Sequence, residues 1–217
     1  MTAKTLGLSD ELHAYVVAHS CPPDPLIADL IAETLAVLPA ESGMQIAPEQ
    51  SGFLTLFTRL LGVRRAAEVG TFTGLSSISI ARGMADDGVL TCFDISEEYT
   101  SIARKYWARA GLTDKIELRI GSAAEKLREL PAEEHLDLAF IDADKASYPT
   151  YWAELVPRMR PGGVILLDNV LRHGRIVAPQ SPDDHAMVAF NDAVLADERV
   201  DSVLLPLADG LTIARKR

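Results

Sequence analysis

The sequence predicts a Rossmann-like α/β fold, with a doubly wound sheet of seven strands and a helical cap at the N-terminus. Short apolar runs alternate with helical stretches from residue 65 onward, which is the pattern of parallel strands joined by helices. The last two apolar runs are separated only by a short turn, which predicts an antiparallel strand near the C-terminus. Three helix-like stretches precede the first strand.

The N-terminal helices are predicted from residues that favour helix starts. Ser9 precedes two acidic residues, Pro25 follows Asp24, and Glu49 follows Pro48. The three stretches that these signals open are 9–19, 24–38 and 48–61. We therefore expect a cap region over residues 1–62 and a Rossmann-like core over residues 63–217, together forming one domain.

Five apolar runs and four helical stretches make up most of the expected core. Right-handed crossovers through the helices would place these runs in one parallel sheet. The runs are AAEVG (66–70), VLTCFD (89–94), IELRIG (116–121), LDLAFID (136–142) and VILLDN (164–169), and the helical stretches are 75–85, 97–110, 122–130 and 147–160. After a further helix near 183–197, DSVLLPL and LTIARKR are joined by a turn around Gly210, which predicts a hairpin.

Composition limits the kind of protein. The chain has 217 residues, of which 48% are hydrophobic and 24% charged, as in ordinary globular proteins. It has no apolar run long enough to span a membrane, and its start lacks a signal-peptide pattern, so we expect a cytoplasmic protein without a membrane partner. The formal charge of −10 disfavours nucleic acid as a partner, because affinity for phosphates comes mainly from Lys and Arg.

The cysteines and histidines suggest no zinc site. Cys92 lies in a strand-like run and Cys21 precedes two prolines, and neither has disulfide or metal-type spacing. Four histidines likewise lack ligand spacing and are expected to be surface or core residues: His13, His19, His135 and His185.

The turn after the first predicted strand carries the first functional signal. Its Gly70 and Gly74 do not form the GxGxxG pattern of dinucleotide-binding proteins. Asp94 ends the second strand, where a carboxylate can accept hydrogen bonds from both ribose hydroxyls, and Glu68 suits a neighbouring cationic group. S-adenosylmethionine combines a ribose, an ammonium and a sulfonium, so these residues indicate this cofactor.

The second signal lies at the ends of the fourth and fifth strands. Asp142 ends the fourth strand, and Asp168 and Asn169 end the fifth, so their oxygens are expected to converge. Oxygen ligands suit Mg²⁺, with Ca²⁺ or Mn²⁺ as alternatives. Lys145 would stand beside this metal as a proton acceptor. Considered alone, the DADK segment is more typical of a solvated loop with an internal ion pair, or of a helix cap, than of a functional site.

At these residues the chain resembles the class I, metal-dependent O-methyltransferases of the caffeoyl-CoA and catechol type, particularly small bacterial members. The resemblance covers residues 40–217, and its motifs recur in order: MQIAPEQSGFL, EVGTFTGLS, FDISEEY, IDADK, PGGVILLDNVL and LPLADGLTIARK. It implies metal ligands at Asp142, Asp168 and Asn169, and catalytic residues at Asp142 and Lys145, with Lys145 as the base.

The resemblance also implies a set of cofactor contacts. They are Met44 and Ile46 through the backbone, Glu68 at the amino-acid end, Gly70 and Thr71 in the turn, Ser76 at the carboxylate, Asp94 at the ribose, Ala123 at the adenine, and Asp142 and Tyr151. For Tyr151, core packing is an equally good expectation.

The family also implies a homodimer, and the second helix contains apolar residues that suit an interface: Leu26, Ile27, Leu30, Ile31 and Leu35. The same residues could instead pack on the sheet of their own chain.

One segment departs from the family. Many relatives have an aromatic residue after DNVL, where this chain has Arg172 and His173. Arg172 is expected either to contact a polar or anionic part of the acceptor or to lie in a solvated loop.

We expect transfer of a methyl group from S-adenosylmethionine to one oxygen of a vicinal-dihydroxy aromatic small molecule, such as a catechol or caffeoyl-like phenol. An RNA (tRNA) hydroxyl methyltransferase on the same scaffold is the first alternative, and the net charge disfavours it. A nucleotide-binding regulator or an oxidoreductase is the second, and it would need phosphate-binding glycines that the turn lacks.

Overall fold

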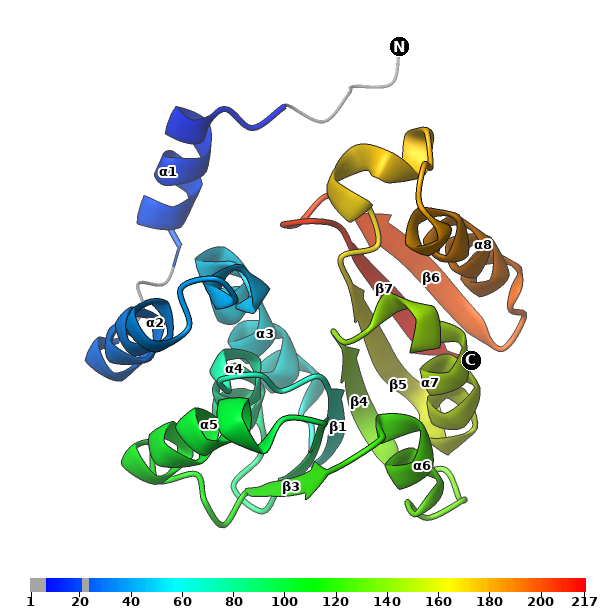
Figure 1. The fold of residues 1–217 in the computed structure, drawn as a ribbon. Helices are drawn as coiled ribbons and strands as arrows, with labels where there is room; N and C mark the ends of the chain where they lie inside the picture. Colours follow the sequence, from blue (N-terminus) through cyan, green and yellow to red (C-terminus); the bar gives the residue numbers. More distant parts are fainter. Residues whose placement is uncertain (1–6, 21–23) are drawn as a thin grey trace.

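The computed structural model describes residues 7–20 and 24–217. Cys21 lies outside the described residues. Seven strands form one sheet in the order β3-β2-β1-β4-β5-β7-β6 (Figure 1). β7 pairs antiparallel with β5 and β6, and the remaining neighbours are parallel. The strands are β1 (Arg65–Val69), β2 (Val89–Asp94), β3 (Ile116–Ile120), β4 (Leu136–Ile141), β5 (Met159–Asp168), β6 (Val200–Leu205) and β7 (Leu211–Lys216). The predicted fold class is confirmed.

Helices cover both faces of the sheet (Figure 1). α2 (Pro25–Val37), α3 (Pro48–Leu61), α4 (Leu75–Gly83) and α5 (Glu97–Arg109) share one hydrophobic core with one face, and α6 (Ala123–Arg128), α7 (Tyr148–Leu155) and α8 (Pro182–Ala196) share a second core with the other. Alternate residues of β4 point into the two cores: Leu138 and Phe140 into the first, Ala139 and Ile141 into the second. Coverage of both faces explains why this strand is a continuous apolar run.

The N-terminal helices begin where the capping signals predict. In α1 (Asp10–Ala18) the Ser9 hydroxyl accepts a hydrogen bond from the Leu12 N–H, and in α2 the Asp24 carboxylate accepts one from Ile27. Short 3₁₀ turns, which the pattern did not predict, are η1 (Ser42–Met44), η2 (Lys145–Ser147), η3 (Val156–Arg158) and η4 (Arg172–Val177).

Two adjoining boundaries are predicted wrongly. The sequence predicts a helix up to residue 160 and a strand from residue 164, whereas α7 ends at Leu155 and β5 already begins at Met159. Pro161 and two glycines occupy the start of β5, and such residues normally indicate a turn. They are accommodated here because the pairing register with β4 shifts between Leu136 and Leu138.

The apolar residues of α2 mostly serve the chain's own core. Ile27 and Leu30 are buried, and Leu26 and Ile31 pack against the same cluster, whereas Leu35 is exposed. The homodimer therefore stays a prediction. Within residues 7–20 and 24–217, no helix is both long and apolar enough to cross a membrane.

Candidate active site

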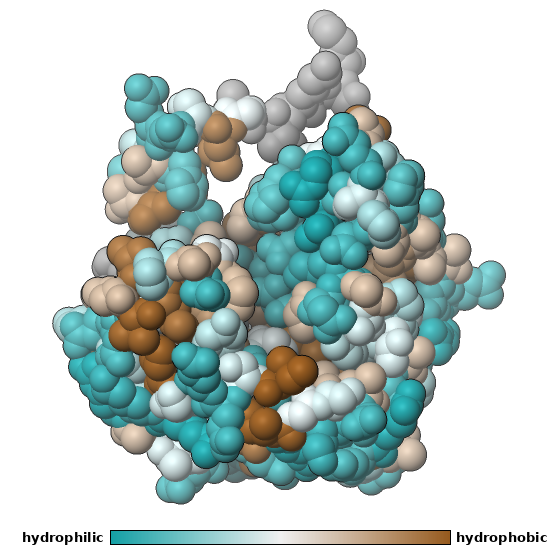
Figure 2. Space-filling model, viewed as in Figure 1, coloured by the Kyte–Doolittle hydropathy of each residue, from teal (hydrophilic) through white to brown (hydrophobic). Residues whose placement is uncertain are grey.

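A cavity of about 890 Å³ opens at the carboxyl ends of β1, β2, β4 and β5. It forms the hollow in the middle of the face shown in Figure 2. This is where open α/β sheets bind ligands. Most of the predicted site residues line it: Met44, Ile46, Gly70, Thr71, Ser76, Asp94, Ala123, Asp142, Lys145, Tyr151, Asp168, Asn169 and Arg172. Glu68 is the exception.

The glycine turn after β1 forms the floor of the cavity. Gly70 has a φ of +90°, and a Cβ there would lie 1.9 Å from the backbone oxygen of Asp142. Only glycine allows the ends of β1 and β4 to approach this closely. Gly74, at φ +89°, precedes α4, and a side chain at this position would clash with Ala103 of α5. The N-terminus of α4, with Ser76 in its first turn, therefore faces the cavity and favours an anionic group.

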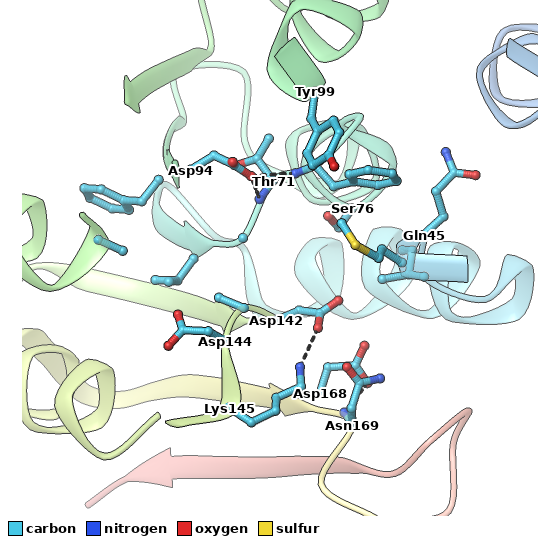
Figure 3. Close-up of a pocket in the computed structure, with 18 of the residues that line it drawn as sticks. Gln45, Thr71, Ser76, Asp94, Tyr99, Asp142, Asp144, Lys145, Asp168 and Asn169 are labelled. Atoms are coloured by element: carbon cyan, nitrogen blue, oxygen red, sulfur yellow. Dashed lines mark hydrogen bonds and ion pairs between the residues drawn. The ribbon is translucent and has the colours of Figure 1, made fainter. Parts of the chain in front are cut away.

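Asp94 supports this turn from the end of β2 (Figure 3). Its Oδ2 accepts hydrogen bonds from the N–H groups of Thr71 (2.9 Å) and Phe72 (2.8 Å), and its Oδ1 accepts one from Ser96 (2.7 Å). Each carboxylate oxygen can accept about two hydrogen bonds, so acceptor capacity remains for a ligand. Asp94 therefore both shapes the turn and faces the cavity.

Glu68 lies behind the cavity wall. It is fully buried on β1, where its Oε2 accepts a hydrogen bond from the Cys92 thiol at 3.2 Å and its Oε1 has no hydrogen-bond partner. Burial raises the pKa of Glu68 to about 8, although the nearby groups of Ser76, Cys92 and Thr71 oppose the shift. Glu68 is thus next to the cavity-lining residues Thr71 and Ser76 without lining the cavity itself.

Lys145 and Asp142 form an ion pair on the opposite wall (Figure 3). Lys145 Nζ donates to Asp142 Oδ1 at 2.9 Å and to the Tyr148 hydroxyl at 2.8 Å. That hydroxyl lies 3.0 Å from the backbone oxygen of Asp168 and 3.2 Å from that of Ile141, so it ties the ends of β4 and β5 together. Burial, followed by the charges of Asp142 and Asp168, raises the pKa of Tyr148. The internal ion pair considered from the sequence exists, but both side chains are largely buried rather than solvated.

Asp168 ends β5, Asn169 follows it, and both lie beside Asp142. Asp168 is 1% exposed, and burial together with the charge of Asp142 raises its pKa. Two crowded carboxylates with an amide oxygen beside them form a hard donor set that suits a divalent cation. In the described residues no group of three or more His, Cys, Asp and Glu side chains could hold a metal, so the predicted set depends on the Asn169 amide.

Asp144 and Tyr151 form a second polar pair on the cavity wall. The Tyr151 hydroxyl donates to Asp144 Oδ1 at 2.5 Å, and burial and Asp144 raise the pKa of Tyr151. Tyr151 is 5% exposed and also packs in the second core, so it meets both expectations, cavity wall and core packing.

The predicted acceptor residue Arg172 is not solvated. Its side chain is 18% exposed, with Nε 3.4 Å from Asp184 Oδ1 and Nη2 3.8 Å from Asp183. Asp184 is 1% exposed and also binds Arg175 at 3.1 Å. Two arginines thus share one buried carboxylate at the start of α8. His173 lines the cavity beside Arg172 but is 74% exposed, and its N–H donates to Asp209.

Backbone strain is concentrated at the cavity. Within the described residues, five that are not glycine have a positive φ, and all five line this cavity: Phe72, Asn169, Arg172, His173 and Ala208. Such conformations cost about 1–3 kcal/mol each and occur mainly at functional sites. The loops 169–173 and 208–210 are also joined by the hydrogen bond from the Leu171 N–H to the Asp209 oxygen.

Several lining residues were missed by the sequence analysis: Gln45, Gln50, Phe72, Thr73, Tyr99, Ala208 and Asp209. Gln45 lies in the sequence between the predicted cofactor contacts Met44 and Ile46, so its position next to them could have identified it. Asp209 reaches the cavity only because β7 inserts between β5 and β6, which local patterns do not reveal.

Comparisons with known proteins agree with this geometry. The family model described as O-methyltransferase matches residues 17–217. The chain belongs to this O-methyltransferase family. Caffeoyl-CoA O-methyltransferase 2 of Zea mays is 34% identical over 229 residues, covering 98% of this chain and 85% of the relative. Tricin synthase 2 of Oryza sativa subsp. japonica is 33% identical over 228 residues, covering 98% of this chain and 77% of the relative.

Solved structures of O-methyltransferases share the fold. An O-methyltransferase from Bacillus cereus, solved in complex with SAH, has a TM-score of 0.86 and 31% identity, and the match covers 95% of this chain and 97% of that one. The prediction of an O-methyltransferase is therefore confirmed, and the regulator and oxidoreductase alternatives are not supported.

Proposed function

We propose that this O-methyltransferase transfers a methyl group from S-adenosylmethionine to one oxygen of a vicinal-dihydroxy aromatic acceptor, with a divalent cation bound at Asp142, Asp168 and Asn169. The observation that carries the proposal is the convergence of these oxygen donors with Lys145 at the ends of two adjacent strands. The same cavity extends to Asp94 and the start of α4, so donor and acceptor have room in one space.

The donor half of the cavity suits an adenosyl amino acid. Asp94 Oδ1 has acceptor capacity left for a ribose hydroxyl, and the N-terminus of α4 with Ser76 suits the carboxylate. Glu68 lies one layer behind and provides a buried acidic group close to the ammonium. The Bacillus cereus relative was solved with the demethylated product of this donor, SAH, which supports the assignment.

The acceptor half contains the acid and amine groups. When bound, the cation supplies positive charge beside the acceptor oxygens and S-adenosylmethionine supplies the methyl group. Lys145 Nζ, on the cavity wall, takes the proton from the acceptor hydroxyl as the neutral amine, after it has released its own proton, because the ammonium form that pairs with Asp142 cannot accept one. The acceptor oxygen then forms the O–C bond while the C–S bond breaks and its electron pair stays on sulfur. Tyr148 holds Lys145 in place through the 2.8 Å hydrogen bond.

The acceptor is proposed to be a small phenol. Two relatives are named for caffeoyl-CoA and for tricin synthesis, and both names refer to phenolic chemistry. An RNA hydroxyl as acceptor would need a basic approach to the cavity, whereas the walls carry Asp94, Asp142, Asp144, Asp168 and Asp209.

A panel assay with methyl-labelled S-adenosylmethionine tests the proposal. Catechols, caffeoyl esters, flavonoids, matched phenols with a single hydroxyl and tRNA are offered separately with Mg²⁺, and the labelled product is identified by mass spectrometry. We expect monomethylated ortho-diphenols and no label in phenols that have a single hydroxyl. Label in tRNA alone would contradict the proposed acceptor while leaving the donor assignment intact.

A further inference from the structure

The side chain of Gln45 forms hydrogen bonds with two buried threonines from other segments of the chain. Its Nε2 donates to the hydroxyl of Thr34 in α2 at 3.0 Å and to the hydroxyl of Thr73 in the glycine turn at 3.0 Å. The two hydroxyls are themselves 3.0 Å apart, with Thr34 donating to Thr73. One amide group thus joins three segments that are distant in sequence.

The segment that carries Gln45 covers one side of the cavity. Gly43, Met44, Gln45 and Ile46 all line it, whereas Thr34 does not. In the part of the chain that the structure describes, every other hydrogen bond of residues 42–46 stays within residues 38–45. Ile46 adds an apolar contact with the first core. The Gln45 amide is therefore the polar link between this segment and the rest of the enzyme.

The two threonines are well placed to fix the segment. Both are fully buried, so their hydroxyls have no access to water and depend on each other and on Gln45. Thr73 belongs to the turn whose N–H groups are held by Asp94 through Thr71 and Phe72. Figure 3 shows the Gln45 side chain directed away from the acidic wall of the cavity. A shift of the 42–46 segment would therefore break a satisfied buried cluster.

We propose that Gln45 is a positioning residue that latches residues 42–46 over the cofactor half of the cavity, through Thr34 and Thr73. The latch keeps this side of the pocket closed against the glycine turn and slows the departure of the bound adenosyl ligand. This inference rests on the proposed placement of S-adenosylmethionine in the cavity, and it adds a residue that controls how long the ligand stays.

The test uses Thr34, because it belongs to the latch and does not line the cavity. Thr34→Val keeps the side-chain shape and removes the hydroxyl, and Thr34→Ser restores a hydroxyl. Thr58→Val is the matched control, because Thr58 is also buried in a helix but its hydroxyl has no hydrogen-bond partner. Dissociation of tritiated SAH is followed after a chase with unlabelled SAH, and thermal unfolding is recorded for each ligand-free variant.

We expect Thr34→Val to release SAH about 3- to 10-fold faster than wild type, the range set by loss of a buried hydrogen bond. Thr34→Ser should approach the wild-type rate, and Thr58→Val should not change it. Gln45→Met should release SAH at least as fast as Thr34→Val, and the double variant should be no faster than Gln45→Met alone. If Thr34→Val also lowers stability, the rates of the double variant still show whether Thr34 and Gln45 act together, because residues that act through one contact do not have additive effects.

The possible failures are distinguishable. Wild-type enzyme that binds SAH while Thr34→Val and Gln45→Met both release it at the wild-type rate would overturn the latch and leave the proposed function standing. Rates that multiply in the double variant would also overturn it, because Gln45 and Thr34 would then act independently. Wild-type enzyme that binds no SAH would overturn the proposed function and the latch together.

Discussion

The Nζ atom of Lys145 lies 2.9 Å from Oδ1 of Asp142, at the end of the strand that forms the middle of the sheet. Both side chains are largely buried and line the cavity. Asp142 also faces Asp168, whose pKa is raised by burial and by this neighbouring charge. A cation beside the two carboxylates would relieve their repulsion, and an amine would stand next to the acceptor oxygens.

Replacement of Lys145 by Met should lower kcat for a catechol by about 10²- to 10⁴-fold, because it removes the proposed general base. The KM for S-adenosylmethionine should change little, since Lys145 belongs to the acceptor half. Lys126→Met is the matched control, because Lys126 forms an ion pair with Glu129 on the surface of α6. Steady-state kinetics check the prediction, and a kcat within threefold of wild type would rule out Lys145 as the base.

The contact between Gly70 and Asp142 predicts a large effect of one methyl group. Gly70→Ala would place a Cβ 1.9 Å from the Asp142 backbone oxygen at a φ of +90°. Gly111→Ala has a comparable φ of +68° but nothing within 4 Å of the new Cβ. We expect Gly70→Ala to lose at least about 2 kcal/mol more unfolding free energy than Gly111→Ala, as measured by urea denaturation. Equal losses would show that the close approach has no energetic role.

The sequence predicted the strand and helix pattern well because both sheet faces are covered. Continuous apolar runs such as Leu138 to Ile141 can then be told from amphipathic helices by composition. It predicted most cavity residues because the carboxyl ends of parallel strands share one edge.

What the sequence could not reveal depends on tertiary geometry. Asp94 holds the N–H groups of Thr71 and Phe72 in addition to any ribose, and Glu68 is one layer too deep to line the cavity. Arg172 is paired with Asp184 because the loop after β5 folds back on α8. These pairings arise between segments whose relative placement no local pattern encodes.

The buried carboxylate of Glu68 predicts a pH-dependent stability. The ordinary pKa of 4.5 applies to the unfolded chain, whereas burial raises it to about 8 in the folded, ligand-free enzyme. Between these values the folded state must keep a proton that the unfolded state has released, so stability falls as pH rises toward 8. Glu68→Gln avoids this loss, and its stability relative to wild type should rise by about 1.4 kcal/mol per pH unit between pH 5 and 8.

Urea unfolding of ligand-free wild type and Glu68→Gln across this range measures the difference. Glu129→Gln, at a largely exposed position, serves as control and should follow wild type at every pH. Parallel curves for wild type and Glu68→Gln would show that the Glu68 carboxyl is not protonated when buried.

The arginine pair near α8 predicts acceptor preference. Arg172 lines the cavity, and its guanidinium, held by Asp184 and Asp183, has further N–H donors that suit an acidic acceptor. Arg172→Trp should change the ratio of kcat/KM between caffeate and catechol more than tenfold in favour of catechol, since a charge-assisted contact is worth about 1.5–3 kcal/mol. Arg215→Trp, at a largely exposed site on β7, is the control. An unchanged ratio in Arg172→Trp would mean that Arg172 only anchors its loop.

The most direct test of the central claim is methyl transfer by metal-free enzyme. Enzyme stripped with EDTA is assayed with methyl-labelled S-adenosylmethionine and a catechol, first without metal and then with added Mg²⁺, while binding of tritiated SAH is measured in parallel. Because Asp142, Asp168 and Asn169 form a hard oxygen donor set, we predict less than about 1% of the full rate without metal, recovery with Mg²⁺, and unchanged SAH binding. Methylation of the catechol at the full rate by the metal-free enzyme would contradict the account.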